Sequence, residues 1–269
     1  MLHTFKAFGA DQIPAWAGGV TFFCLLALFP SLSVFASLYG LFGDTNQARQ
    51  QILGLNGVLP AGAIAVLGDQ LIFLSTTSHR RLGIAFALGL LFSVWSSNAG
   101  VKSLFAGLNA AYEKKERRSF IRLNLVSLAF TFGLVLFSIL AIATIAAAPA
   151  TLSLVGLGSL SKFAFLRWPL ILLVVGAMLS LLYRFGPSKT STRWRWITPG
   201  SIAAAIVWLL MSLGFSWYAA NFGNFNQTYG ALGGVAGFMT WIWLSAMIVL
   251  CGAELNAEIE RHTAASVGR

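Results

Sequence analysis

A run of 58 residues, from Trp196 to Ala253, contains no Asp, Glu, Lys, Arg or His. A helix needs about 20 apolar residues to cross the hydrocarbon core of a bilayer, so the run has room for two crossings and a turn. Polar but uncharged residues collect at one point and place that turn: Asn221, Asn224, Asn226, Gln227 and Thr228. The sequence therefore predicts an integral membrane protein whose C-terminal third is a transmembrane hairpin.

The composition agrees with this prediction. Hydrophobic residues make up 57% of the 269 residues and charged residues only 10%, whereas a soluble domain carries roughly 25% charged residues. We expect one membrane domain over residues 1–269, with no room for a separate soluble catalytic domain of about 100 residues. The net charge is +10, but the basic residues cluster in short loops, where they orient helices and meet anionic lipid head groups. We therefore expect the lipid bilayer, and not nucleic acid, as the partner.

Gaps between charged residues predict an all-α bundle of six transmembrane helices. The predicted crossings are residues 18–42, 82–101, 123–147, 163–183, 197–220 and 231–251. Thirteen Lys and Arg residues lie in the N-terminus, the second and fourth loops and the C-terminus, and five lie in the other loops. Because basic loops stay in the cytoplasm, we expect both termini to be cytoplasmic. Arg80 and Arg81, outside the second helix, argue mildly against this orientation.

Two loops predict shorter interfacial helices. Residues 52–74 of the first outer loop are apolar but interrupted by proline, glycine and polar residues, which favours interfacial helices over a crossing. A crossing there would reverse the orientation. In the first cytoplasmic loop, Phe105, Leu108 and Tyr112 recur at helical spacing. This spacing predicts a short amphipathic helix along the inner membrane surface.

A basic cluster follows that predicted amphipathic helix. It consists of Lys114, Lys115, Arg117 and Arg118. On the inner membrane surface each of these side chains would gain about 1 kcal/mol from lipid phosphates. The cluster is therefore a candidate contact for anionic phospholipid head groups, although a purely topological role explains it without any ligand.

Polar residues within the apolar helices suggest a translocation path. Pro30 deprives the carbonyl of Leu26 of its helical donor, and that carbonyl needs another partner in a region without bulk water. The kink could open a polar cavity, or Ser31 or a neighbouring helix could satisfy the carbonyl. Ser97 and Asn98 belong to a polar stripe on the second helix. Such a stripe lines a water-filled path or serves hydrogen bonds between helices.

The last helix carries glycines and, just beyond it, an acidic residue. Glycines spaced by four let another helix backbone approach closely; they are Gly230, Gly233, Gly234 and Gly237. Glu254 is the acidic residue nearest to the hydrocarbon, and an ionisable group in that position is a functional candidate. It also lies near the cytoplasmic boundary, where Arg184 or Arg195 could simply pair with it.

No residue pattern indicates a catalytic centre, a metal site or a cofactor. The only histidines are His3, His79 and His262, and none lies at ligand spacing from another. Both cysteines, Cys24 and Cys251, fall inside predicted helices and read as packing residues. The chain also lacks a GxxxxGK nucleotide-binding loop.

Four stretches, in this order, resemble the YihY/BrkB family of bacterial inner-membrane proteins. They are residues 21–30 (TFFCLLALFP), 103–118 (SLFAGLNAAYEKKERR), 182–187 (LYRFGP) and 229–256, from Tyr-Gly-Ala-Leu-Gly to Gly-Ala-Glu-Leu-Asn. The resemblance implies six helices in the inner membrane with both termini inside. Members have carried the label of a tRNA-processing ribonuclease. The scattered histidines argue against that activity here, because a zinc-dependent nuclease needs converging ligands.

Two functional hypotheses follow. The first is a transporter or exporter of a small solute or an amphipathic lipid-like molecule, with a path along Pro30, Ser97, Asn98, Tyr229, Glu254 and Asn256. The second is an envelope scaffold or assembly factor without a conduit. A homo-oligomer is compatible with either. A cavity that continues across the bundle would favour the first hypothesis, and a tightly packed bundle would favour the second.

Overall fold

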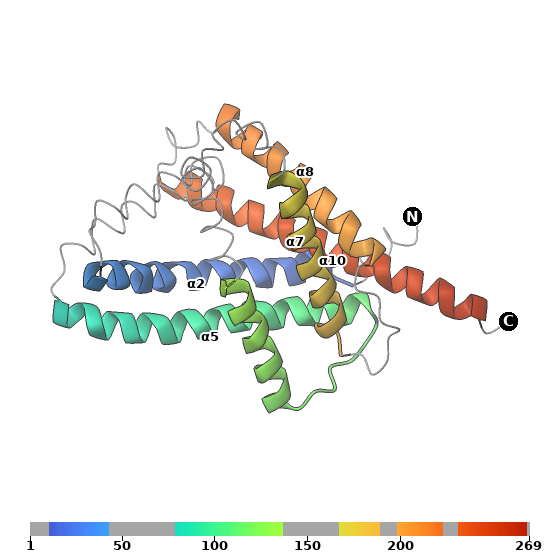
Figure 1. Cartoon of the computed structure of the whole chain (residues 1–269), viewed down its shortest axis with the longest axis horizontal. Helices are drawn as coiled ribbons and strands as arrows, with labels where there is room; N and C mark the ends of the chain where they lie inside the picture. The colour runs from blue at the N-terminus through green and yellow to red at the C-terminus, as the bar shows by residue number, and fades with distance from the viewer. Residues whose placement is uncertain (1–10, 43–78, 137–166, 189–197, 223–230, 268–269) are drawn as a thin grey trace, which may run out of the picture. The chain divides into compact units, whose positions relative to one another are not determined.

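The computed structural model describes residues 11–42, 79–136, 167–188, 198–222 and 231–267, and these residues form helices and short connections without a β-strand (Figure 1). The helices are α2 (Ile13–Phe42), α5 (His79–Ala111), a helix over Phe120–Leu136, α7 (Arg167–Phe185), α8 (Pro199–Phe222) and α10 (Ala231–Val267). The all-α prediction is confirmed for the described part of the chain. The interfacial prediction for residues 52–74 lies outside it.

The prediction of a separate amphipathic helix after the second crossing is wrong. Residues 102–111 continue α5 without a break, because no proline interrupts them and because Phe105 and Leu108 are buried in the core. The helix ends at Ala111, and Glu113, two residues further on, has a left-handed φ of 51°. Its N–H donates to the carbonyl of Ala110 at 2.8 Å, a common way to close a helix C-terminus.

Helix α10 is longer than the crossing predicted at 231–251. It has 37 residues and continues to Val267, whereas a crossing needs about 20. Its last turns carry Glu254, Glu258 and Arg261, which share one helix face because they are spaced by four and three residues. The extension thus presents charged side chains beyond the apolar part of the helix.

Large apolar side chains are exposed along several helices. Two helices, Pro199–Tyr218 and Gly233–His262, are long and apolar enough to cross a membrane, yet only 22% and 11% of their most apolar windows are buried. The core helix of a soluble protein would instead bury most of such a surface. The helix Phe120–Leu136 likewise exposes Ile121, Leu125 and Phe132. These surfaces match the hydrocarbon of a bilayer and not water.

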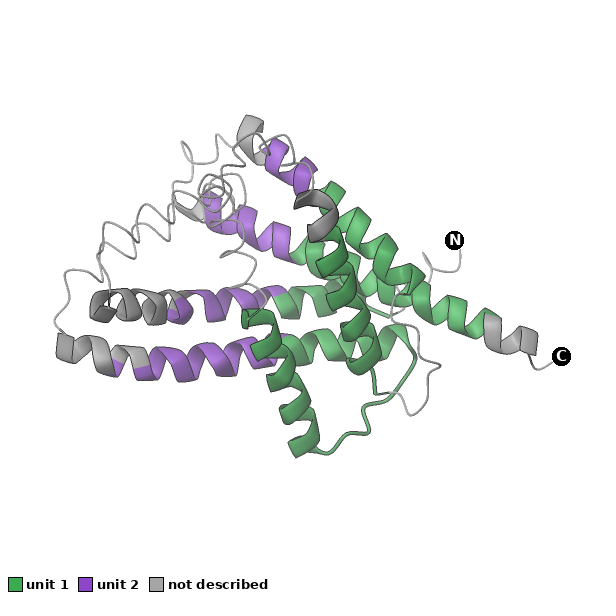
Figure 2. Ribbon diagram, viewed as in Figure 1, with its two compact units in different colours: residues 1–20, 101–211, 243–269 green, residues 21–100, 212–242 purple. Residues whose placement is uncertain are grey.

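The chain divides into two compact units, shown in Figure 2. Unit 1 comprises Met1–Val20, Val101–Met211 and Trp243–Arg269, and unit 2 comprises Thr21–Gly100 and Ser212–Ile242. The buried hydrophobic cluster of the described residues lies in unit 1, where Phe105, Leu108, Tyr183, Leu250 and Ala253 pack together. The expected single membrane domain over residues 1–269 stays a prediction.

Helix contacts in unit 2 use hydroxyl and indole groups. Ser96 is fully buried and donates its hydroxyl to the carbonyl oxygen of Phe23 in α2 at 3.0 Å. Trp241 donates its indole N–H to the hydroxyl of Ser212 at 3.2 Å. At Ser96, therefore, the polar stripe of α5 serves a hydrogen bond between helices.

Candidate functional site

Helices α8 and α10 meet in unit 1 at two glycines. A Cβ added to Gly200 would fall well inside contact distance of the Gly252 carbonyl oxygen, so only glycine fits there. Gly252 in turn faces Tyr183 of α7, which is 2% exposed and donates its hydroxyl to the carbonyl of Val249 at 2.7 Å. The absence of two side chains thus brings the backbones of α8 and α10 together, and Tyr183 fixes α10 against α7.

Asn256 holds the N-terminus of α8. Its Oδ1 accepts the backbone N–H of Gly200 at 2.9 Å, and its Nδ2 donates to Oγ1 of Thr198, also at 2.9 Å. The first N–H groups of a helix have no partner within the helix, so this side chain satisfies one of them. Asn256 is 2% exposed. Its amide therefore holds two helices together, a structural role that the predicted translocation path did not include.

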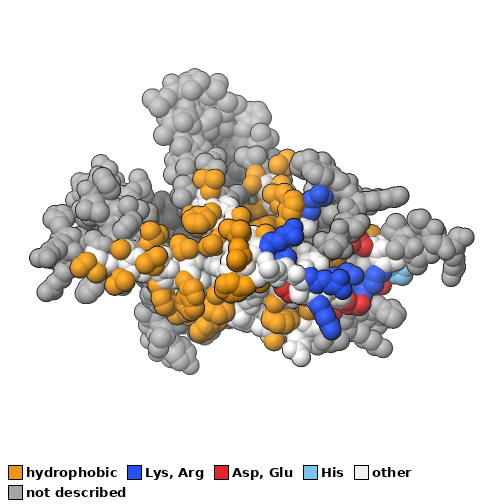
Figure 3. Space-filling model, turned by 90° about the horizontal axis from the view of Figure 1, so that it is seen from below, with side chains coloured by type: hydrophobic (Ala, Val, Ile, Leu, Met, Phe, Trp, Pro, Cys, Tyr) orange, Lys and Arg blue, Asp and Glu red, His pale blue; other side chains and the backbone are white. Residues whose placement is uncertain are grey.

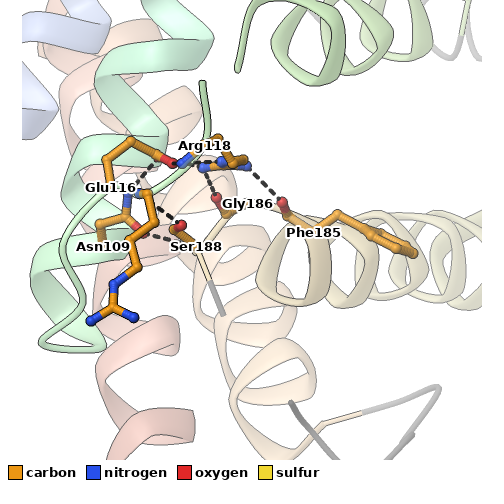
Figure 4. Close-up of polar contacts among 7 residues, drawn as sticks. Asn109, Glu116, Arg118, Phe185, Gly186 and Ser188 are labelled. Carbon is orange, nitrogen blue, oxygen red and sulfur yellow. Dashed lines mark hydrogen bonds and ion pairs between the residues drawn. The ribbon is translucent and has the colours of Figure 1, made fainter. Parts of the chain in front are cut away.

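The loop after α5 is fastened to the end of α7 by a set of contacts that we call the Arg118 clasp (Figure 4). Arg118 donates to the carboxylate of Glu116 at 2.6 and 2.8 Å and to the carbonyl oxygens of Gly186 and Phe185 at 2.7 and 3.2 Å. Its guanidinium carbon also lies 5.1 Å from the ring centre of Phe105. With its side chain only 9% exposed, Arg118 is committed to these partners.

Asn109 completes the Arg118 clasp. Its Nδ2 donates at 2.9 Å to Oε2 of Glu116, which also accepts from Arg118, and its Oδ1 accepts the backbone N–H of Ser188 at 2.7 Å. The hydrogen bonds from Arg118, above all that of its side chain, and the one from Asn109 favour the ionised carboxylate. They lower the pKa of Glu116 to about 2. The Glu116 carboxyl in the clasp is therefore ionised at neutral pH.

A second set of charged residues lies around Glu254. The Arg261 guanidinium lies 3.9 Å from Oε2 of Glu254 and 3.1 Å from Oε2 of Glu258, and it also pairs with Glu113 at the end of α5. The carboxyl of Asp11, just before α2, lies within hydrogen-bonding reach of Glu254. We call these five residues the Glu254 cluster. They bring together the start of α2, the end of α5 and the last turns of α10.

Burial distinguishes Glu254 from the other members of the cluster. Its side chain is 1% exposed, whereas that of Arg261 is 43% exposed. Tyr112 lies against the same region, and its hydroxyl hydrogen-bonds the side chain of Asn256. Burial raises the pKa of Tyr112, so this hydroxyl stays neutral. The cluster is thus an acidic centre with a solvent-facing arginine on its outer side.

Charged and apolar side chains occupy different areas of the face in Figure 3. Lys and Arg side chains gather there together with Asp and Glu, while many hydrophobic side chains lie apart from them. Lys114, Lys115 and Arg117 are exposed. Contact between these three residues and anionic lipid stays a prediction, whereas the structure gives Arg118 the internal partners described above.

The residues of the predicted path fall in different parts of the chain. Pro30, Ser97 and Asn98 lie in unit 2, and Asn98 is 6% exposed. Glu254 and Asn256 lie in unit 1, and Tyr229 lies outside the described residues. The path as a whole stays a prediction.

The predicted packing of the glycines of the last helix also stays a prediction. Gly230 lies outside the described residues, and a Cβ at Gly237 would meet no described atom within 4 Å. Gly233 and Gly234 are half-buried, and their packing role stays a prediction. The close approaches that the structure describes are at Gly200 and Gly252 instead.

Sequence reasoning missed several members of the site. The sequence offered Arg184 or Arg195 as a possible partner of Glu254; among the described residues the ion pair of Glu254 is with Arg261, and Arg195 lies outside them. The spacing of Glu254, Glu258 and Arg261 on one helix face was a signal for this group, had the helix been extended beyond residue 251. Asp11 carried no comparable signal, because its approach to Glu254 depends on how α2 packs.

The described residues are helical, expose long apolar helix surfaces and place their charged contacts at helix ends, which is typical of membrane proteins. Residues 4–268 match the model of the family described as Virulence factor BrkB, and the chain belongs to this family.

Similarity to curated proteins agrees with this assignment. The chain is 31% identical over 254 residues to the ribonuclease-like protein YfkH of Bacillus subtilis, which covers 90% of this chain and 88% of YfkH. It is 28% identical over 257 residues to a UPF0761 membrane protein of Aliivibrio salmonicida, 93% of this chain and 79% of that protein. A UPF0761 membrane protein of Ralstonia nicotianae is 26% identical over 264 residues, 96% of this chain but only 58% of its own length. The relatives named as membrane proteins support a membrane location. No solved structure matches this chain.

Proposed function

We propose that this BrkB-family protein is a transporter or exporter of a small solute or an amphipathic lipid-like molecule. The observation that supports the proposal is the buried carboxyl of Glu254, which is 1% exposed on a helix of membrane-crossing length. Burying an ionisable group is costly, and alanine or leucine would pack a helix without that cost. Ionisable groups kept in such positions are typical of ion and substrate pathways.

The proposal includes a topology of six crossings in the bacterial inner membrane, with both termini in the cytoplasm. This topology is supported by the contacts between helix ends in unit 1. The start of α2 meets the end of α10 through Asp11 and Glu254, and the end of α5 meets the end of α7 through Arg118. The start of α8 meets α10 through Gly200 and Asn256. All of these ends belong to the segments that the count of basic residues assigns to the cytoplasm.

An uptake experiment tests the proposal. Purified protein is reconstituted into liposomes and incubated with an isotope-labelled bacterial extract, and the compounds retained inside are identified by mass spectrometry. A parallel assay follows the movement of fluorescent phospholipids between leaflets, which covers a lipid-like substrate. The proposal predicts at least one compound that accumulates above the level of protein-free liposomes. Equal levels in both assays would contradict it.

The topology is tested separately by labelling. Single cysteines replace Lys115 or His262 in a chain whose Cys24 and Cys251 are serines, and a membrane-impermeant maleimide is added to spheroplasts and to inverted vesicles. We expect both positions to react only in inverted vesicles. Reaction of either position in intact spheroplasts would contradict the assigned orientation.

One observation favours the alternative of a scaffold without a conduit. The backbones of α8 and α10 approach so closely at Gly200 and Gly252 that no solute fits between them there. An envelope defect of a deletion strain that is rescued equally by the wild type and by E254Q would support the scaffold. The name of YfkH refers to that protein, and we do not extend ribonuclease activity to this chain.

A further inference from the structure

The Glu254 cluster concentrates negative charge in a strongly basic protein. The chain has only eight acidic residues and a net charge of +10. Four of the eight lie in this cluster, which are Asp11, Glu113, Glu254 and Glu258. One guanidinium, that of Arg261, faces all three glutamates. The cluster therefore carries more carboxyl groups than its own arginine can neutralise.

Glu254 has acceptor capacity that the described residues do not use. Its Oε1 is buried and has no hydrogen-bond donor among them. The neighbouring carboxyl of Asp11 cannot supply one while both groups are ionised, because ionised carboxylates only accept hydrogen bonds. Two adjacent carboxylates in a buried position require a positively charged donor or a shared proton between them. A positively charged donor is therefore one of the two ways to satisfy the buried oxygen, and the described residues do not supply it.

Arg261 indicates which kind of donor fits. Its guanidinium lies 3.1 Å from Glu258 but 3.9 Å from Glu254, so it satisfies the outer carboxylates and stays beyond hydrogen-bond distance of the inner one. The Arg261 side chain is 43% exposed and carries its charge on a long flexible stem. It can therefore move towards solvent without a change in the helix backbone. A planar cation with N–H groups is already accommodated at the outer side of the site.

We propose that the Glu254 cluster is a binding site for a cationic nitrogen group that carries N–H donors, an ammonium or a guanidinium, and that Arg261 occupies its outer part until the ligand displaces it. The inference rests on the proposed transport function and assigns a charge class to the substrate. Glu254 and Asp11 accept the N–H groups of the ligand, and the Arg261 guanidinium returns when the ligand leaves. Charge-assisted hydrogen bonds of this kind are about twice as strong as neutral ones.

Calorimetric titration of the full-length protein in detergent tests the proposal. The probe is methylguanidinium, and tetramethylammonium is the matched control because it has the same charge but no N–H donor. We expect methylguanidinium to bind and tetramethylammonium to bind at least about tenfold more weakly, a difference of about 1.4 kcal/mol. Absence of methylguanidinium binding, or equal binding of both cations, would overturn the proposal.

Three variants assign the binding to this cluster. E254Q and D11N each remove one inner carboxylate while keeping the shape, and both should weaken methylguanidinium binding at least about tenfold. E260Q removes a carboxylate from an exposed position of the same helix and should bind like the wild type. If E254Q fails to fold, D11N still decides the question. Unchanged binding in both inner variants, or an equal loss in E260Q, would overturn the assignment.

Substitution of Arg261 distinguishes a binding site from a cluster with a purely structural role. R261A removes the internal competitor, so methylguanidinium should bind several-fold more tightly than to the wild type. Weaker binding to R261A would show that Arg261 is part of the binding surface and not its occupant, which contradicts the proposal.

The source of the cationic group is distinguished in nanodiscs. If the amine of a lipid head group is the ligand, phosphatidylethanolamine should weaken methylguanidinium binding relative to nanodiscs of phosphatidylglycerol alone. If the ligand is a soluble amine, both lipid compositions should give the same affinity. Methylguanidinium binding without any uptake would support the cation site and contradict transport. Uptake that methylguanidinium does not affect would support transport and contradict the cation site.

Discussion

Unit 1 joins its helix ends with carboxylate, guanidinium and amide side chains, whereas the helix contacts described in unit 2 use hydroxyl and indole groups. In unit 1, Arg118, Asn109 and Asn256 each connect two segments far apart in sequence. In unit 2, Ser96 donates one hydrogen bond to Phe23, and large side chains such as Leu91 and Trp95 are exposed. Buried polar networks specify one arrangement of the parts that they join. Apolar side chains are exposed in both units, so the comparison indicates that unit 1 differs in holding its helix ends in one arrangement through charged and amide side chains.

Removing Arg118 should have the largest effect on this difference. R118A removes the donor of the Phe185 and Gly186 carbonyls and the guanidinium beside Glu116, which keeps its hydrogen bond from Asn109. We expect a loss of about 3 kcal/mol, because several hydrogen bonds of a charged group, each contributing about 1.5–3 kcal/mol, are lost together. Thermal unfolding in detergent measures it. The control is R117A, whose side chain is exposed and whose effect should stay within about 0.5 kcal/mol. Equal melting temperatures for the two variants would contradict the role of the clasp.

A methyl group at Gly200 should have the next largest effect. G200A places a Cβ against the backbone of α10, which cannot move as a flexible side chain can, and we expect a loss of about 2 kcal/mol from overpacking. The matched control is G237A, where the added Cβ meets no described atom and should stabilise the helix by roughly 0.5–1 kcal/mol. If both substitutions change the unfolding temperature in the same direction, the close approach of α8 and α10 at Gly200 is contradicted.

The Arg118 clasp should also make unit 1 sensitive to acid. The pKa of Glu116 is lowered from 4.5 to about 2 in the folded protein, so ionised Glu116 stabilises the fold above pH 4.5. Protonation removes this contribution as the pH falls from 4.5 towards 2. Unfolding temperatures measured between pH 5 and pH 2 should therefore fall less steeply for E116Q than for the wild type. Parallel curves for the two proteins would show that the clasp does not depend on this charge.

The smallest effect is expected in unit 2. S96A removes one hydroxyl that bonds the carbonyl of Phe23, and hydrogen bonds between membrane helices contribute about 0.6 kcal/mol on average. Unfolding measured as for R118A should detect at most a small shift. A loss as large as that of R118A would show that the two units do not differ in the way proposed.

The sequence predicted the helices better than the contacts between them. Apolar runs bounded by charges placed each described helix, because burial in hydrocarbon leaves a direct composition signal. The same signal could not show that α5 continues through Phe105 and Leu108, since a core-facing helix turn and an interfacial helix share one spacing. It marked Glu254 as unusual but did not point to Arg261, because the predicted helix ended at residue 251 and Arg261 lies two turns beyond Glu254.

Roles that depend on the approach of distant segments were beyond sequence reasoning. Asn256 caps α8, which begins 56 residues earlier in the chain, and its place on a translocation path stays a prediction. Arg118, a candidate contact for lipid head groups in the sequence, donates to the carbonyl of Gly186, 68 residues later. No periodicity connects positions so far apart. The pairing follows only once the helix ends have been brought together.

The most direct test of the account compares uptake by E254Q and E260Q. The two substitutions remove the same charge from the same helix, one at a buried position and one at an exposed position. For the compounds that wild-type proteoliposomes accumulate, we predict that E254Q falls to the level of protein-free liposomes and that E260Q stays near wild type. Both variants should still fold, as judged by thermal unfolding. Wild-type uptake by a folded E254Q protein would contradict the account.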